Sequence, residues 1–226
     1  MSNLLRLPDV RRAGRLLTTP ANSVDDWGRD AQLVGIARRL AGLRWSVDVD
    51  GEQHLPRTAG ALLVASSRRY SLSALFAAFT VGALVERPVR FVGRPDVAPV
   101  GDLLRRLGGL LARPDEVAGA LRHGELVLMT TAPTGNARHA GAVDHALLAA
   151  AGATGVAVHP VATLSSRLAR SARVTIGPAM RPRRGRRGPL AEVELAEDVQ
   201  RAIQRMLDGL GLIRTGNTVI DLMARN

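Results

Sequence analysis

The segment from Ser66 to Ser73, SSRRYSLS, concentrates two arginines and four serines directly after the apolar run GALLVA. A short buried strand that ends in polar residues and leads into a helix is a common way to present side chains to a substrate. Guanidinium forks and hydroxyl groups bind phosphate or carboxylate oxygens, whereas an arginine stays protonated and cannot act as a general base. The segment therefore predicts an anion-binding corner; the alternative is that Arg68 and Arg69 only face solvent at a strand end.

Alternating strands and helices would position this corner. Apolar runs typical of strands occur at 44–51, 60–66, 89–94, 125–130, 155–163 and 172–180. Helical patterns occur at 25–43, 72–84, 114–123, 142–151 and 190–210, and the pattern at 101–112 runs from a helix into a possible strand. This order predicts an α/β fold with a mixed, mostly parallel central sheet flanked by helices. Because such sheets carry their sites at the carboxyl ends of strands, we expect function after residue 65 and in TTAPTGN, 130–136.

The first and last helices carry more specific expectations. Asp25 and Asp26 are well placed to cap the start of the first helix. The last helix is amphipathic, and the apolar side that should pack on the domain consists of Leu190, Val193, Val199, Ile203, Met206 and Leu210.

A chain of 226 residues suits one α/β domain with short accessory segments. We expect a basic N-terminal arm at 1–24, the α/β domain at 25–180, an arginine-rich loop at 181–189, and a C-terminal helix and tail packing on the domain at 190–226. The loop, RPRRGRRGP, holds five arginines in nine residues and is typical of a solvated or membrane-facing segment.

Charge and composition limit the partners. All 31 basic residues are arginines and the formal net charge is +11, which attracts the protein to anionic surfaces such as phospholipid headgroups or nucleic acid. Cysteine does not occur in the sequence, which excludes thiolate chemistry, and we expect no metal or other cofactor. Without a recognisable signal peptide or spanning segment, we expect a cytoplasmic protein that is either free or bound peripherally to the inner face of the cell membrane. Residues 1–17 are then either a membrane-surface segment or a solvated arm.

Four segments extend the pattern from about residue 47 to residue 178: VDGEQHLPRTAGALLVAS, FVGRPDVAPVGDLLRRLGGLLAR, GELVLMT and GVAVHPVAT. Their order and spacing resemble the glycerolipid acyltransferase family, which acylates glycerol-3-phosphate and 1-acylglycerol-3-phosphate. The resemblance implies that family's α/β fold, acyl-CoA or acyl carrier protein as donor, and a lysophospholipid-type acceptor.

The chain departs from the family where the family's chemistry lies. The His-x-x-x-x-Asp motif, in which the His removes a proton from the acceptor hydroxyl and the Asp orients its ring, falls on Arg68 and Ser73. The Phe-Pro-Glu-Gly-Thr-Arg motif falls on TTAPTG, 130–135, where only Thr134 matches. We therefore expect a degenerate active site. The residues that the resemblance and the corner together assign to substrate binding are Ser66, Ser67, Arg68, Arg69, Arg94, Arg113 and Thr134.

A substitute base would have to come from the five histidines. His139 follows TTAPTGN, near the place of the family's acceptor site, and is the best candidate on location. His54 lies in a turn and His123 closes a helix, where its partial charge suits the dipole. His159 lies in an apolar strand, which is typical of a packed ring, and His145 follows an aspartate that points elsewhere on the helix.

Three functions remain open. The chain could be a phospholipid or glycerol acyltransferase with an altered site, or a non-catalytic relative that binds an acyl chain or lipid at the membrane. Its positive charge favours the second. The third function is nucleic-acid binding through residues 181–189. Because the chain has only one Tyr, two Trp and three Phe on which bases could stack, no specific nucleic acid is expected.

Overall fold

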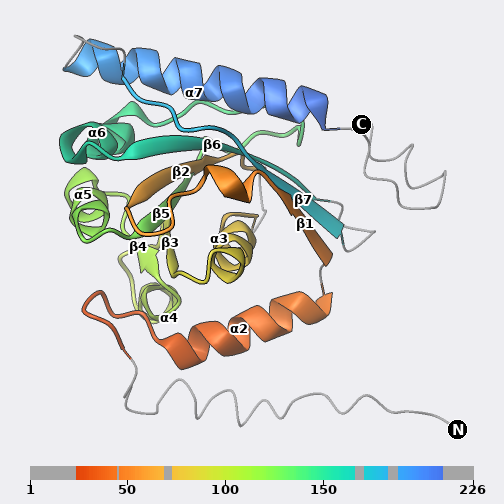
Figure 1. The fold of residues 1–226 in the computed structure, drawn as a ribbon. Helices are drawn as coiled ribbons and strands as arrows, with labels where there is room; N and C mark the ends of the chain where they lie inside the picture. The colour runs from red at the N-terminus through yellow and green to blue at the C-terminus, as the bar shows by residue number, and fades with distance from the viewer. Residues whose placement is uncertain (1–23, 45, 69–72, 166–170, 183–187, 211–226) are drawn as a thin grey trace, which may run out of the picture.

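A computed structural model describes residues 24–44, 46–68, 73–165, 171–182 and 188–210. Figure 1 shows one sheet with helices on both of its faces. The helices are α2 (Ala31–Arg44), α3 (Ser73–Leu84), α4 (Val100–Arg106), α5 (Pro114–Arg122), α6 (His145–Thr154) and α7 (Pro189–Gly209), with the short 3-10 turn η1 (Glu52–His54). The strands are β1 (Ser46–Asp50), β2 (Ala61–Ala65), β3 (Val89–Val92), β4 (Gly109–Leu110), β5 (Leu126–Thr130), β6 (Ala157–Ser165) and β7 (Ser171–Ile176).

The sheet has the strand order β1-β7-β6-β2-β5-β3-β4. β2 pairs in parallel with β5 on one side and with β6 on the other, and β3 pairs in parallel with β5 and β4. Among the described strands, the one antiparallel pairing joins β6 to β7, and β1 then pairs in parallel with β7. The predicted class, an α/β fold with a mixed, mostly parallel sheet flanked by helices, is confirmed.

The central strand β2 is covered on both faces. All five of its residues, ALLVA, are fully buried. Leu62 and Val64 pack with buried residues of α5, α6 and α7, whereas Ala61, Leu63 and Ala65 pack with those of α3. Figure 1 shows the two helical layers on opposite sides of the sheet. A continuous apolar run is what a parallel strand in this position requires, and its burial at about 25 cal/mol per Å² of apolar surface favours folding.

Helix α7 packs against β6 and α6, but the prediction of its buried face was wrong at two positions. Leu190 and Val193 are exposed, at 68% and 38%. The buried face instead follows a spacing of four residues along the helix, and its members are Ala191, Leu195, Ala196, Val199, Ile203 and Leu207. Leu190 lies one residue before Ala191 and Val193 two residues after it, so at about 3.6 residues per turn both point away from this row.

Parts of the predicted accessory segments lie outside the described residues, namely 1–23, 183–187 and 211–226. In the remaining chain, the helices are too short or too polar to cross a membrane.

Helix α2 begins at Ala31, later than the predicted start at Asp25. The Oδ1 atom of Asp30 accepts the N–H groups of Gln32 and Leu33 at 3.0 and 3.1 Å, so Asp30 is the cap. Asp25 instead closes a turn, in which its Oδ1 atom accepts the N–H groups of residues 27 and 29 at 3.0 and 2.9 Å. The predicted caps were wrong because the Oδ1 atom of Asp25 is used in this turn and the helix begins only after Asp30.

A buried arginine holds that turn against the sheet. Arg90 on β3 is 1% exposed, and its Nη2 atom donates to Asp25 at 2.7 Å and to Glu125 at 3.3 Å. The guanidinium carbon also lies 5.7 Å from the centre of the Trp27 ring, which stands nearly perpendicular to the His123 ring with the two centres 5.8 Å apart. Two carboxylates and an aromatic face compensate the buried charge. The sequence VRFV reads only as an apolar strand, so this ion pair was not predicted.

The Asp30→Ala substitution should lower the free energy of unfolding by roughly 3 kcal/mol at neutral pH, because it removes a helix cap and the partner of Arg106 at 2.7 Å. Burial tends to raise the pKa of Asp30, but the hydrogen bonds from Arg106, Leu33 and Gln32 outweigh burial and hold the pKa below its usual 3.8. A carboxyl group whose pKa is lower in the folded than in the unfolded state stabilises the fold at pH values above its unfolded-state pKa. This stabilisation is lost as the pH falls through the folded-state pKa. The difference between wild type and variant in urea unfolding, followed by tryptophan fluorescence, should therefore shrink below about pH 3.8.

Asp26→Ala is the matched control, since Asp26 is exposed and such changes usually shift stability by less than about 0.5 kcal/mol. Equal losses in the two variants would contradict the assignment of Asp30 as the cap and ion-pair partner.

Candidate functional site at the carboxyl edge of the sheet

The corner after β2 lies beside the segment that follows β5. The Thr131 N–H donates to the carbonyl of Ala65 at 2.9 Å, and the Ser67 N–H donates to Thr131 Oγ1 at 3.2 Å. The Thr134 N–H then donates to the carbonyl of Ser67 at 3.2 Å, and Arg68 forms a parallel bridge with Thr134. The structure thus brings together Ser67, Arg68 and Thr134, three of the predicted substrate-binding residues.

Ser66 faces β6 instead of the open corner. It is 3% exposed, its N–H donates to the carbonyl of Val161 at 2.9 Å, and its Oγ atom accepts the Thr163 N–H at 2.8 Å. The Thr163 hydroxyl in turn donates to the Ser66 carbonyl at 2.8 Å. These reciprocal bonds clamp the end of β2 to β6, so the Ser66 hydroxyl is engaged in the fold and is not directed at a ligand.

Arg68 is half-buried at the end of this pairing. Within the described part of the chain its guanidinium has no ion-pair partner. Arg69 lies outside the described residues, as does the side chain of Ser73, although Ser73 itself begins α3. The roles predicted for Arg69 and Ser73 therefore stay predictions.

The loop after β5 is held by Thr134. Its Oγ1 atom lies 2.6 Å from the carbonyl oxygen of Asn136, 3.2 Å from that of His139 and 3.4 Å from that of Ser67. A hydroxyl has one proton to donate, and Asn136 is the nearest acceptor. His139 is exposed, and its backbone N–H donates to Asn136 at 3.2 Å. Thr134 and His139 therefore belong to one compact loop beside Arg68.

A cavity of about 370 Å³ opens at the same edge, at the ends of β3 and β5 and the start of α6. Thr131 belongs both to its wall and to the corner, and the rest of the lining is largely apolar, as with Met129 and Leu147. Asp144 is its one ionisable lining residue, and the Oδ1 atom of Asp144 caps α6 by accepting two N–H groups at 2.9 and 3.2 Å. The sequence analysis missed this cavity, because its lining comes from segments more than 50 residues apart, from Val92 to Leu147.

The two other predicted substrate-binding arginines are engaged with carboxylates. Arg94 is 14% exposed and lies 3.7 Å from Glu116 and 3.9 Å from Asp96. Arg113 is largely exposed and donates to Asp96 at 3.1 Å. Asp96 thus links Arg94 to Arg113, and neither pairs with a described residue of the corner.

Three of the other histidines are bound to backbone carbonyls. The Nδ1 atoms of His54, His123 and His159 lie 2.9, 3.2 and 3.2 Å from the carbonyl oxygens of Ile176, Gly119 and Gly177. His159 is 1% exposed, and burial, followed by the nearby His54, lowers its pKa even though the Gly177 bond opposes this change. The prediction that His159 is a packed ring is confirmed, and its bond to Gly177 adds a backbone partner.

The arrangement at the corner can bind an anion more readily than it can move a proton. It offers the guanidinium of Arg68, whose N–H groups can donate to phosphate or carboxylate oxygens, whereas the Thr134 hydroxyl is used within its own loop and Thr131 is 1% exposed. None of the described histidines forms an ion pair with a carboxylate, an arrangement that would orient an imidazole as a base. In the same part of the chain, no three His, Asp or Glu side chains are grouped to hold a metal ion.

Comparison with known proteins finds a similar structure but no similar sequence. No protein-family model matches the chain, and no curated protein matches it. Among solved structures, the 1-acyl-sn-glycerophosphate (LPA) acyltransferase PlsC from Thermotoga maritima is similar, with a TM-score of 0.59 and 17% identity over 91% of this chain and 84% of that one. The fold is therefore that of this acyltransferase.

The clamp between β2 and β6 predicts that Ser66→Ala lowers the free energy of unfolding by about 1–3 kcal/mol, because the Thr163 N–H loses its acceptor in a partly buried position. Urea unfolding checks this value. Ser67→Ala is the matched control, since the Ser67 hydroxyl has no bond to a described residue and should change stability by less than about 0.5 kcal/mol. Equal stability of the two variants would show that the clamp contributes nothing.

Proposed function

We propose that this protein is an acyltransferase-like protein with a degenerate site, whose carboxyl-edge corner binds the anionic head of an acyl-bearing or lysophospholipid-type molecule without transferring an acyl chain. The single observation that carries the proposal is the position of Arg68. It lies beside Thr134, at the place that the resemblance assigns to the catalytic histidine, and it has no counter-ion among the described residues.

The physical argument rests on the charge of that side chain. Acyl transfer to a hydroxyl needs a group that accepts the hydroxyl proton as the oxygen attacks the thioester. A guanidinium does not give up its own proton and has no lone pair to accept another. It does present a planar set of N–H donors to a phosphate or carboxylate, which turns the same corner into an anion-binding site.

The cavity beside the corner supports an amphiphilic ligand. Its volume of about 370 Å³ falls in the range of small-molecule sites, and its lining is mostly apolar. Thr131 joins it to the corner, so a ligand with its charged head at Arg68 could place apolar atoms against Met129 and Leu147. The likeness to a glycerophosphate acyltransferase, whose substrates are lipids, agrees with this ligand class.

A catalytic alternative rests on His139, whose carbonyl oxygen lies 3.2 Å from Thr134 Oγ1. In that case the imidazole of His139 takes the proton from the acceptor hydroxyl while the oxygen of that hydroxyl attacks the thioester carbonyl. The thiolate of the donor then leaves and receives the proton from the imidazolium. The exposed ring has no carboxylate partner among the described residues to orient it, which favours the binding function.

The net charge of +11 also favours a peripheral association with anionic membranes on the cytoplasmic side, through which lipid ligands would reach the corner. This association should weaken as salt screens the charges.

Binding of a lysophospholipid to the corner is tested by calorimetric titration of the full chain with lauroyl lysophosphatidic acid, at concentrations below micelle formation. Arg68→Ala should weaken binding by about tenfold or more, because a hydrogen bond to a charged group contributes about 1.5–3 kcal/mol. Monolauroylglycerol, which has the same chain and no phosphate, should bind to wild type and variant equally weakly.

Arg57→Ala is the matched control, since Arg57 is exposed and precedes β2, at the opposite edge of the sheet. It should leave the affinity unchanged. Wild-type affinity in Arg68→Ala, or an equal loss in both variants, would contradict a specific site at this corner.

A further inference from the structure

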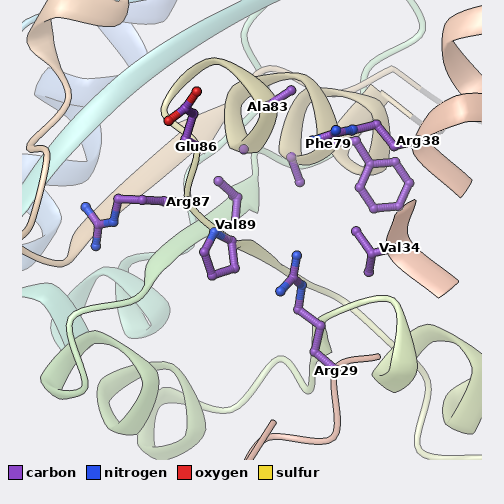
Figure 2. Close-up of a pocket in the computed structure, with 11 residues that line it drawn as sticks. Arg29, Val34, Arg38, Phe79, Ala83, Glu86, Arg87 and Val89 are labelled. Atoms are coloured by element: carbon purple, nitrogen blue, oxygen red, sulfur yellow. The ribbon is translucent and has the colours of Figure 1, made fainter. Parts of the chain in front are cut away.

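A second cavity, of about 400 Å³, lies at the opposite edge of the sheet, between α2, the second half of α3 and the turn that leads into β3. Figure 2 shows side chains from these elements converging on it. No residue of the carboxyl-edge corner lines it, and Val89, the first residue of β3, closes its inner side. It is therefore distinct from the site of the proposed function.

Three arginines line this cavity, and two of them are available to a ligand. Arg87 is engaged, because its guanidinium donates to the backbone carbonyls of residues 56, 58, 59 and 124 at 2.6–3.3 Å. Arg29 and Arg38 form no ion pair with any described residue. Figure 2 shows the guanidinium of Arg29 pointing into the space and that of Arg38 lying beside Phe79.

Arg29 is a half-buried cation whose nearest carboxylates are used by another arginine. Asp25 and Glu125 both accept hydrogen bonds from Arg90, at 2.7 and 3.3 Å. Burial, and next the charge of Arg90, lower the pKa of Arg29, whereas Asp25 and Glu125 raise it. The stem of Arg29 also packs against Gly108, where an added Cβ would meet Arg29 Cδ at 3.3 Å. The local environment therefore fixes this cation and leaves its charge incompletely compensated.

The negative groups near the cavity are turned away from these two arginines or engaged. Glu86 is exposed, and Figure 2 shows its carboxylate on the far side of the opening from Arg29 and Arg38. At the end of α3, the carbonyl of Gly82 accepts the Arg87 N–H at 3.2 Å. The cationic side of the cavity thus remains open to an anion.

The remaining wall is apolar. Phe79 and Ala78 are 8% and 2% exposed, and Val34 on α2 also lines the cavity, with its side chain beside the Phe79 ring (Figure 2). A cavity that joins guanidinium donors to an apolar wall matches a ligand with a charged head and a short apolar body.

We propose that this amino-edge cavity is a binding site for an anionic amphiphile, with the phosphate or carboxylate head between Arg29 and Arg38 and the alkyl part against Phe79 and Val34. The inference is independent of the proposed function, because it uses none of the corner's residues. It gives the protein two anion sites at opposite edges of one sheet.

Calorimetric titration of octyl phosphate into the full chain carrying Arg68→Ala tests the site without a contribution from the corner. Saturable binding with one ligand per chain is expected. Adding Arg29→Gln or Arg38→Gln should weaken it by about tenfold or more, since each removes charge-assisted hydrogen bonds. Adding Arg57→Gln should change nothing. Glutamine keeps the stem, and urea unfolding of each variant without ligand shows whether it is folded.

Three further probes define what the site recognises. Octanoate should compete with octyl phosphate, because its carboxylate can accept hydrogen bonds from the same guanidinium groups. Inorganic phosphate and the uncharged octyl glucoside should each bind at least about tenfold more weakly, since each lacks one half of the ligand. Retained binding in the folded Arg29→Gln and Arg38→Gln variants would overturn the site. If inorganic phosphate bound as tightly as octyl phosphate, the assignment of an amphiphilic ligand would be wrong. A loss of lysophospholipid binding at the corner alone would not affect the proposal for this cavity.

Discussion

The register of β2 is the constraint on which the rest of the structure depends. Its five residues are apolar and fully buried, so the usual alternation of apolar and polar residues cannot define how it pairs with β5 and β6. The ends of the strand supply that definition. Gly60 packs where an added Cβ would lie 2.7 Å from the carbonyl oxygen of Leu121, and Ser66 exchanges hydrogen bonds with Thr163. A shift by one residue would lose both fits, and Arg68 would no longer meet Thr134.

The described arginines fall into two sets, according to whether carboxylates or carbonyls of the fold bind their guanidinium. Arg90 and Arg106 are paired with carboxylates in buried places, and Arg87 is surrounded by carbonyls, so these side chains stabilise the fold. Arg68 at the carboxyl-edge corner, and Arg29 and Arg38 in the lining of the amino-edge cavity, have no counter-ion among the described residues. Part of the net charge of +11 is therefore concentrated at the two edges of the sheet, where anionic ligands could enter.

The sequence predicted those features of the fold that depend on neighbouring residues in the chain. Apolar runs and turn residues predicted the strands, and their order predicted the α/β class, because a parallel strand covered on both faces must be apolar throughout. The start of α2 was missed because Asp25 is used by Arg90, a partner distant in sequence. Leu190 and Val193 were placed on the buried face of α7, although only contact with β6 and α6 decides which row is buried. Neither cavity was predicted, because the lining of each comes from segments that meet only in the folded chain. The segments after β2 and β5 were each expected to carry function, and the structure shows that they are neighbours.

The central claim is that the fold of an acyltransferase carries, in this chain, a corner that binds anions and lacks a general base. The most direct measurement is release of free CoA from long-chain acyl-CoA by the purified full chain, with and without lysophosphatidic acid, beside Arg68→Ala and His139→Ala. The Thermotoga maritima acyltransferase is assayed in parallel as the positive control. We predict no acceptor-dependent release above the blank for any form of this chain. Acceptor-dependent release by the wild type, lost in Arg68→Ala or His139→Ala, would show that the corner has kept or rebuilt its chemistry and would contradict the claim.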